Sequence, residues 1–187
     1  MQALDALLNR VSVPRLLDPA PTAEQREVLF SAAMRAPDHG HLQPWRFLTV
    51  EGQAREQLGE ILAQATLAAN ADALPSAVDK ARIGPLRAPL VVVVIAKLQD
   101  RPKVPKSEQL LAAGCAAHAI LLAAYAQGIG AVWRTGDAAY SPLVAKALGL
   151  AEGEEVIALL YLGTPLNEPR VAEKVDLAKF VSAWSDE

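Results

Sequence analysis

Apolar residues recur every three or four positions in three segments of the first half of the chain, which predicts three helices. The first is a short opening helix that ends near Asn9, with leucines on one face. The second starts at a capping box in residues 22–25 and runs to about Arg35, because Pro37 disfavours helical geometry in the residue before it. The third covers residues 53–73.

Strands are predicted where β-branched and aromatic residues gather between turn residues. Residues 45–50, 131–134 and 156–162 have this pattern. Residues 90–96 (LVVVVIA) are apolar without alternation, which is typical of a strand buried on both faces. Another short helix is predicted over residues 141–149, because Ser-Pro is a common helix start and glycine a common helix end.

The most distinctive helix is predicted from Ser107, as the N-cap, to Gln127, with Gly128 ending it. Between residues 110 and 126 it is apolar almost all round. A membrane span needs about 20 strongly hydrophobic residues, whereas this segment is rich in alanine and contains His118. We therefore expect a helix buried on every side, with a subunit interface covering part of it.

Composition limits the classes of function. A chain of 187 residues is expected to form one domain, residues 1–187, with no linker or repeat. The net charge of −3 and the scattered basic residues predict no nucleic-acid or membrane partner. The N-terminal segment lacks the apolar core of a signal peptide, so we expect a cytoplasmic protein. The single cysteine, Cys115, excludes an intramolecular disulfide, so any redox chemistry requires a cofactor.

Two loops contain candidate site residues. Arg10, Ser12 and Arg15 follow the opening helix, where guanidinium groups and a hydroxyl could hold a phosphate, or could simply form a solvated loop. His39 and His41 lie on a polar loop with Asp38 and could bind a metal, although no second His-rich or Cys-rich segment completes the set.

Other familiar motifs are absent from the sequence. Residues 128–130 (GIG) close a helix and enter a strand, the reverse of a dinucleotide fingerprint. The chain contains no GxGxxG, Walker A or GxSxG motif. Residues 133–136 (WRTG), at a strand end, could form a ligand-binding wall or fill core volume.

Taken in order, these segments resemble the nitroreductase family, in particular its shortest members, along nearly the whole chain. Besides the Arg10-x-Ser12 and Arg15 pattern, the matching segments are Met34–His39, Gln43–Trp45, Val104–Pro105, Gly114–Ala116, Ala126–Gly128, Trp133–Gly136 and Tyr161–Pro165. The resemblance implies an α+β fold with a central mixed β-sheet, flanking helices and an intertwined homodimer. It also implies FMN at the subunit interface and NAD(P)H as electron donor.

The resemblance assigns roles to individual residues. The residues implied to bind FMN, partly from the other subunit, are Arg10, Val11, Ser12, Arg35, His39, Gln43, Trp133, Arg134, Thr135 and Arg170. Val11 stands where the family usually has a second basic residue, so only its backbone can contact the phosphate there. The residues implied to contact the nicotinamide nucleotide are Ala123, Ala124, Tyr125, Ala126, Gln127 and Gly128.

Three functions stay open at this point. The leading one is an FMN enzyme that passes electrons from NAD(P)H to nitro compounds, quinones or similar flat acceptors by a ping-pong mechanism. No catalytic side chain is assigned, because the flavin would carry the chemistry. The second is a flavoprotein of the same fold that performs dehydrogenation or flavin breakdown. The third is a metal-dependent hydrolase or metal-binding protein that uses His39 and His41.

Overall fold

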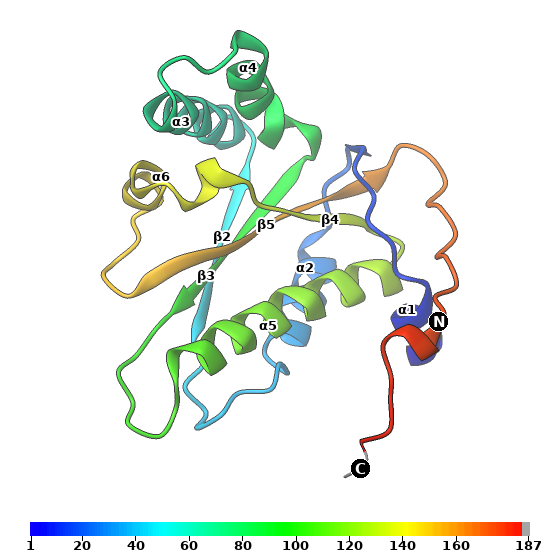
Figure 1. Cartoon of the computed structure of the whole chain (residues 1–187). Coiled ribbons are helices and arrows are strands. Elements are labelled where there is room, and N and C mark those ends of the chain that lie inside the picture. Colours follow the sequence, from blue (N-terminus) through cyan, green and yellow to red (C-terminus); the bar gives the residue numbers. More distant parts are fainter. Residues whose placement is uncertain (185–187) are drawn as a thin grey trace.

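The computed structural model describes residues 1–184, which form a five-stranded sheet between two groups of helices (Figure 1). The longest strand, β5 (Glu154–Pro165), pairs with β3 (Leu90–Lys97) along one edge. Its other edge pairs with β4 (Gly130–Arg134) and β1 (Leu16–Leu17), and β2 (Trp45–Glu51) pairs with the free edge of β3.

Every strand pair in the described part of the chain is antiparallel. The α+β class is therefore confirmed, but the prediction of a mixed sheet is wrong for residues 1–184. Residue patterns show that a segment is a strand and how deeply it is buried. Strand direction depends on how the connecting segments run, which those patterns do not reveal.

The helices lie on both faces of the sheet, as Figure 1 shows. α2 and α5 cover one face, and α3, α4 and α6 lie on the other. Their bounds are α1 Ala3–Asn9, α2 Ala23–Ala33, α3 Ala54–Ala69, α4 Pro75–Ile83, α5 Lys106–Ala126 and α6 Pro142–Ala147. The short 3₁₀ segments are η1 Gly84–Arg87, η2 Asp137–Tyr140 and η3 Leu177–Lys179.

Strand β3 occupies the centre of the core. Leu90, Val92, Val94 and Ala96 pack in one cluster with residues of α2 and α5, and the intervening residues pack in a second cluster with α3 and α6. The residues from Leu90 to Ala96 are all fully buried. The prediction of a strand buried on both faces is confirmed.

The residues just before α2 and α5 determine where these two helices begin. The Thr22 backbone N–H donates to Gln25 Oε1 at 2.9 Å and the Gln25 N–H donates to Thr22 Oγ1 at 3.3 Å, so the predicted capping box is confirmed. α2 ends at Ala33, two residues before the predicted Arg35. α5 begins at Lys106 after Pro105, so the prediction of Ser107 as its N-cap is wrong.

The helix predicted over residues 53–73 is shorter than expected, and a second helix that was not predicted follows it. α3 ends at Ala69, and Pro75 starts α4, which packs against it. Gly59 permits this contact, because a Cβ at this position would collide with the carbonyl oxygen of Arg82. The close approach of the two helices therefore depends on a residue without a side chain.

A single chain does not bury α5 on every side, so that prediction is wrong for the subunit alone. Ala116, Ala117 and Ile120 face the sheet, whereas Leu111 is 70% exposed and Cys115 and His118 are also exposed. Within the described residues this is the one helix long and apolar enough to span a membrane, with a mean hydropathy of 1.6, yet it packs along the sheet.

The opening helix also leaves its apolar face uncovered. Leu4, Leu7 and Leu8 are 66%, 55% and 72% exposed, and only Ala6 of α1 is buried. α1 contacts α5. The leucines of α1 and the exposed residues of α5 therefore add apolar surface to the same side of the sheet.

Candidate functional site

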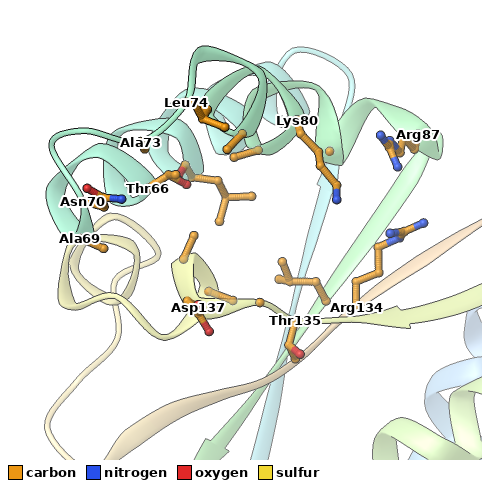
Figure 2. A pocket seen from close by; sticks show the side chains of 18 of the residues that line it. Thr66, Ala69, Asn70, Ala73, Leu74, Lys80, Arg87, Arg134, Thr135 and Asp137 are labelled. Carbon is orange, nitrogen blue, oxygen red and sulfur yellow. The ribbon is translucent and has the colours of Figure 1, made fainter.

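A cavity of about 670 Å³, the main cavity, lies between the α3–α4 pair and the end of β4 and includes Arg134 in its lining. This volume is within the range of about 300–1,000 Å³ that is usual for small-molecule sites. Figure 2 shows its wall, to which α4 contributes Lys80, η1 contributes Arg87 and β4 contributes Arg134. Asp137 is the one carboxylate among its described lining residues.

Arg134 is held in an unusual environment. Its guanidinium lies 5.5 Å from the centre of the Tyr161 ring, a cation–π arrangement. Its Nε is buried and has no hydrogen-bond partner among the described residues. Buried donors nearly always have an acceptor. The geometry therefore fits a ligand that brings an acceptor atom to Arg134.

Tyr161 forms the floor beneath this arginine. Burial raises the pKa of its phenol, although the nearby charges of Arg134 and Arg87 act in the opposite direction. The phenol therefore stays neutral at physiological pH. Tyr161 offers Arg134 an aromatic face rather than a negative charge.

A second cavity, of about 400 Å³, adjoins the first at Arg87 and Arg134, which line both. It adds Arg15 and the β1 residues Leu16 and Leu17. The two cavities thus meet at Arg87 and Arg134. Together they extend from α4 to the N-terminal loop, residues 10–15.

The N-terminal loop is fixed to the same end of the sheet. The Val13 N–H donates to the Ala131 carbonyl of β4 at 2.9 Å. Arg10 and Val11 line a small cavity of about 30 Å³, and Ser12 and Arg170 line a neighbouring one of about 180 Å³. The Val11 side chain is buried, as expected if only its backbone contacts a ligand.

The three predicted residues of β4 and its end do not share one face. Arg134 and Thr135 line the 670 Å³ cavity, whereas Trp133 packs against the core cluster on the α2–α5 face. Successive side chains of a strand point to opposite faces, which explains the separation. Trp133 therefore lies on the α5 side of the sheet, away from the lining of that cavity.

The predicted nucleotide segment, residues 123–128, lies at the end of α5 close to Arg10. Tyr125 and Gly128 line the same 30 Å³ cavity as Arg10. Gln127 Nε2 donates to the Ala123 carbonyl at 3.1 Å, which closes the last turn. Ala124 is buried, Ala126 and Gly128 are exposed, and Gly128 has a φ of +74°.

Arg35, His39 and Gln43 lie elsewhere in the subunit. His39 Nδ1 is 2.6 Å from a carboxylate oxygen of Glu108, in the first turn of α5, and the Gln43 N–H donates to Asp38 Oδ2 at 2.7 Å. α5 has 21 residues and so is about 30 Å long. One chain therefore places His39, and the loop that carries Gln43, near the opposite end of α5 from Arg10 and residues 123–128, while Arg35 follows the end of α2.

The same loop gives little support to a metal site. In residues 1–184, no group of three or more His, Cys, Asp or Glu side chains is arranged to hold a metal ion. His39 instead contacts Glu108, while His41 lines an exposed cavity together with Arg101 and Lys103, whose charges repel a cation.

Sequence reasoning missed Lys80 and Arg87, which face the main cavity. Their segment has no strong apolar stripe, and only Val78 of α4 is buried. Leu74-Pro75 does carry a usable signal, because proline favours the first turn of a helix. That signal would have placed Lys80 on a separate helix.

The sequence was also compared with known protein families and individual proteins. The Nitroreductase family matches residues 7–164. YdjA of Escherichia coli K12, which carries the name of an NAD(P)H nitroreductase, is 48% identical over 165 residues, 88% of this chain and 89% of its own length.

Solved structures agree on the fold. A nitroreductase-like family protein from Bacillus cereus has a TM-score of 0.83 at 21% identity, with 98% of this chain and 96% of that chain covered. A nitroreductase from Desulfovibrio desulfuricans, solved in complex with FMN, has a TM-score of 0.75 at 23% identity, with 100% and 99% covered. Given the family match and the identity to YdjA, this chain belongs to the nitroreductase family.

Proposed function

We propose that the protein is an FMN-dependent oxidoreductase that passes electrons from NAD(P)H to nitro compounds, quinones or similar flat acceptors. The observation that carries the proposal is the cationic cavity with the unpartnered Nε of Arg134, in a chain of the nitroreductase family. The name of YdjA and the FMN complex of the Desulfovibrio relative support the donor and the cofactor.

The residues around the cavities fit FMN. Arg10, Ser12 and Arg170 would hold its phosphate and ribityl chain, because guanidinium forks suit phosphate oxygens. Arg134 and Thr135 would line the slot for the ring, where Arg134 Nε needs an acceptor. When bound, FMN would supply the hydride-accepting and electron-donating chemistry that no side chain here offers.

We propose a homodimer because Arg35, His39 and Gln43 lie apart from the other residues predicted to bind FMN. Arg35, His39 and Gln43 are not among the residues that line the Arg134 cavity of their own chain, and His39 lies instead at the first turn of α5. A second subunit packed on the exposed residues of α5 and α1 could bring its own Arg35, His39 and Gln43 to that cavity. We propose that residues 1–187 form one domain of this cytoplasmic dimer.

The overall reaction balances without further reactants. NAD(P)H gives a hydride, the buffered solvent gives a hydronium proton, and a nitro group becomes nitroso with release of one water molecule and NAD(P)⁺. A quinone takes the same hydride and proton and becomes a hydroquinone. Residues 123–128 would contact the nicotinamide nucleotide from the end of α5 next to Arg10.

The purified protein is expected to bind FMN, and Arg10→Ala is expected to weaken binding by about 1–3 kcal/mol, the range for a charged hydrogen bond left unmade. The fold should persist, because Arg10 lies just after α1 rather than in the core. FMN fluorescence quenching in a titration measures the affinity. Lys97→Ala, at an exposed residue of β3, serves as control and should leave it unchanged. Equal affinities in wild type and Arg10→Ala would remove Arg10 from the site.

Steady-state rates should show a ping-pong mechanism. The donor and the acceptor each need contact with the same cofactor ring, so the oxidised nucleotide must leave before the acceptor binds. When NAD(P)H and 4-nitrobenzamide are varied together, double-reciprocal plots should give parallel lines. Intersecting lines would show that both substrates are bound at once.

A further inference from the structure

The three cations of the main cavity have no carboxylate partner among the described residues, in contrast to those cations of the fold that form ion pairs. Arg26, Arg46 and Arg82 pair with Glu51, Glu154 and Glu60. Among the described residues, Lys80, Arg87 and Arg134 form no such pair, although all three line one cavity.

Their neighbours do not neutralise them. Asp79, next to Lys80 in sequence, is engaged by Arg82 at 2.6 Å. Asp137 is the one acidic residue of the described lining, and Tyr161 stays neutral. Figure 2 shows Lys80 and Arg134 extending into the space between α4 and β4 from opposite walls. The cavity thus concentrates positive charge in a protein whose net charge is −3.

The proposed cofactor does not account for this charge. An FMN phosphate carries about two negative charges. Arg10 and Arg15 of the N-terminal loop, with Arg170 after β5, line neighbouring cavities and supply three positive groups for it. Arg134 is the cation we assign to the ring slot, which leaves Lys80 on α4 without a role in holding FMN.

The wall of the cavity formed by α3, α4 and the segment between them suits a flat ring. Leu62, Ala69, Ala73, Leu74 and Ala77 line it with apolar surface. If NAD(P)H and the acceptor occupy the main cavity in turn, the phosphate groups of the nucleotide are gone when the acceptor binds. The cations of the cavity then face the acceptor alone.

We propose that the protein prefers aromatic acceptors that bear a carboxylate or sulfonate, and that Lys80 is the residue that selects this negative charge. The inference rests on the proposed function and specifies the substrate class of the same site. Lys80 and Arg87 are exposed, so each should act as a screened charge of moderate strength rather than as a buried ion pair.

The test compares two acceptors of nearly equal shape, 4-nitrobenzoate and neutral 4-nitrobenzamide. Their kcat/KM ratio is measured in wild type, in Lys80→Gln and in the control Lys97→Gln, which removes a lysine at the far end of β3. Comparing ratios between variants cancels the different intrinsic reactivity of the two nitro groups. Binding of benzoate and benzamide, which are not reduced, is measured in parallel from changes in flavin absorbance.

Lys80→Gln should lower the benzoate-to-benzamide ratio about fivefold, the factor expected from one solvent-screened charge pair, and Lys97→Gln should leave it unchanged. The wild-type ratio should also fall as salt rises from 0.02 to 0.5 M, because the Debye length is about 10 Å at 0.1 M and shortens with added salt. A ratio that is the same in wild type and Lys80→Gln would overturn the proposal. Failure to reduce either nitro compound would count against the proposed function, while benzoate binding would still decide the role of Lys80.

Discussion

Gly59→Ala is expected to lower the free energy of unfolding by about 3 kcal/mol, at the upper end of what added methyl groups cost in packed interiors. The new Cβ would collide with the Arg82 carbonyl oxygen, and backbone atoms cannot turn aside as the end of a flexible side chain can. α3 and α4 would have to separate. Because α4 carries Lys80, the wall of the main cavity should move with it.

Urea unfolding followed by circular dichroism measures this effect. Gln64→Ala provides the control, since Gln64 lies on the same helix with an exposed side chain, away from the proposed dimer interface. Glutamine and alanine are both good helix formers, so the control should be neutral or slightly stabilised. Equal stability of Gly59→Ala and wild type would show that α3 and α4 adjust to the methyl group at no cost.

Leu111→Glu is expected to convert the proposed dimer into monomers that have lost most of their FMN. Leu111 is 70% exposed on α5 in the single chain, so a charge there leaves the subunit fold intact. In an interface, the same charge would be buried without a partner, which typically destabilises by about 3–5 kcal/mol. The subunits would separate, and each cavity would lose the partner's Arg35, His39 and Gln43.

Light scattering gives the mass of the particle, and absorbance near 450 nm gives the flavin that it retains. Leu67→Glu makes the same change at an exposed leucine of α3, on the other face of the sheet, and should leave a flavin-loaded dimer. An arginine at Ala116 would be a poor alternative, because Ala116 is fully buried against its own sheet and the subunit itself would unfold. A stable monomer with full flavin content would contradict the dimer proposal.

Sequence patterns correctly predicted those helices and strands whose formation depends on residues close to one another in the sequence. The apolar run of β3, the capping box at Thr22 and the strand before Thr135 were predicted within about three residues of their observed ends. The mixed sheet and the full burial of α5 were wrong, because strand direction and the choice of covered helix face are set by distant parts of the chain. Alanines line both sides of α5, so composition could not show which side meets the sheet.

The candidate site was predictable to a similar degree. Arg10, Ser12 and Arg134 were predicted from motifs as site residues, and the structure places them at the same end of the sheet. Lys80 and Arg87 were not, since they reach the cavity only through the packing of α4 on α3. That packing depends on the missing side chain of Gly59 rather than on any recognisable motif.

The position of β5 has a consequence for the order of events during synthesis. β5 is the shared partner of β1, β3 and β4, and Leu16 pairs with Pro165 across nearly the whole length of the chain. Pairings between residues so far apart in sequence form slowly, because a large loop must close first. While the ribosome is still making residues before 154, β1 has no strand to pair with and one edge of β3 stays open. The nascent chain must therefore remain free of aggregation with a strongly apolar strand edge exposed, and it can acquire its cofactor only near the end of translation.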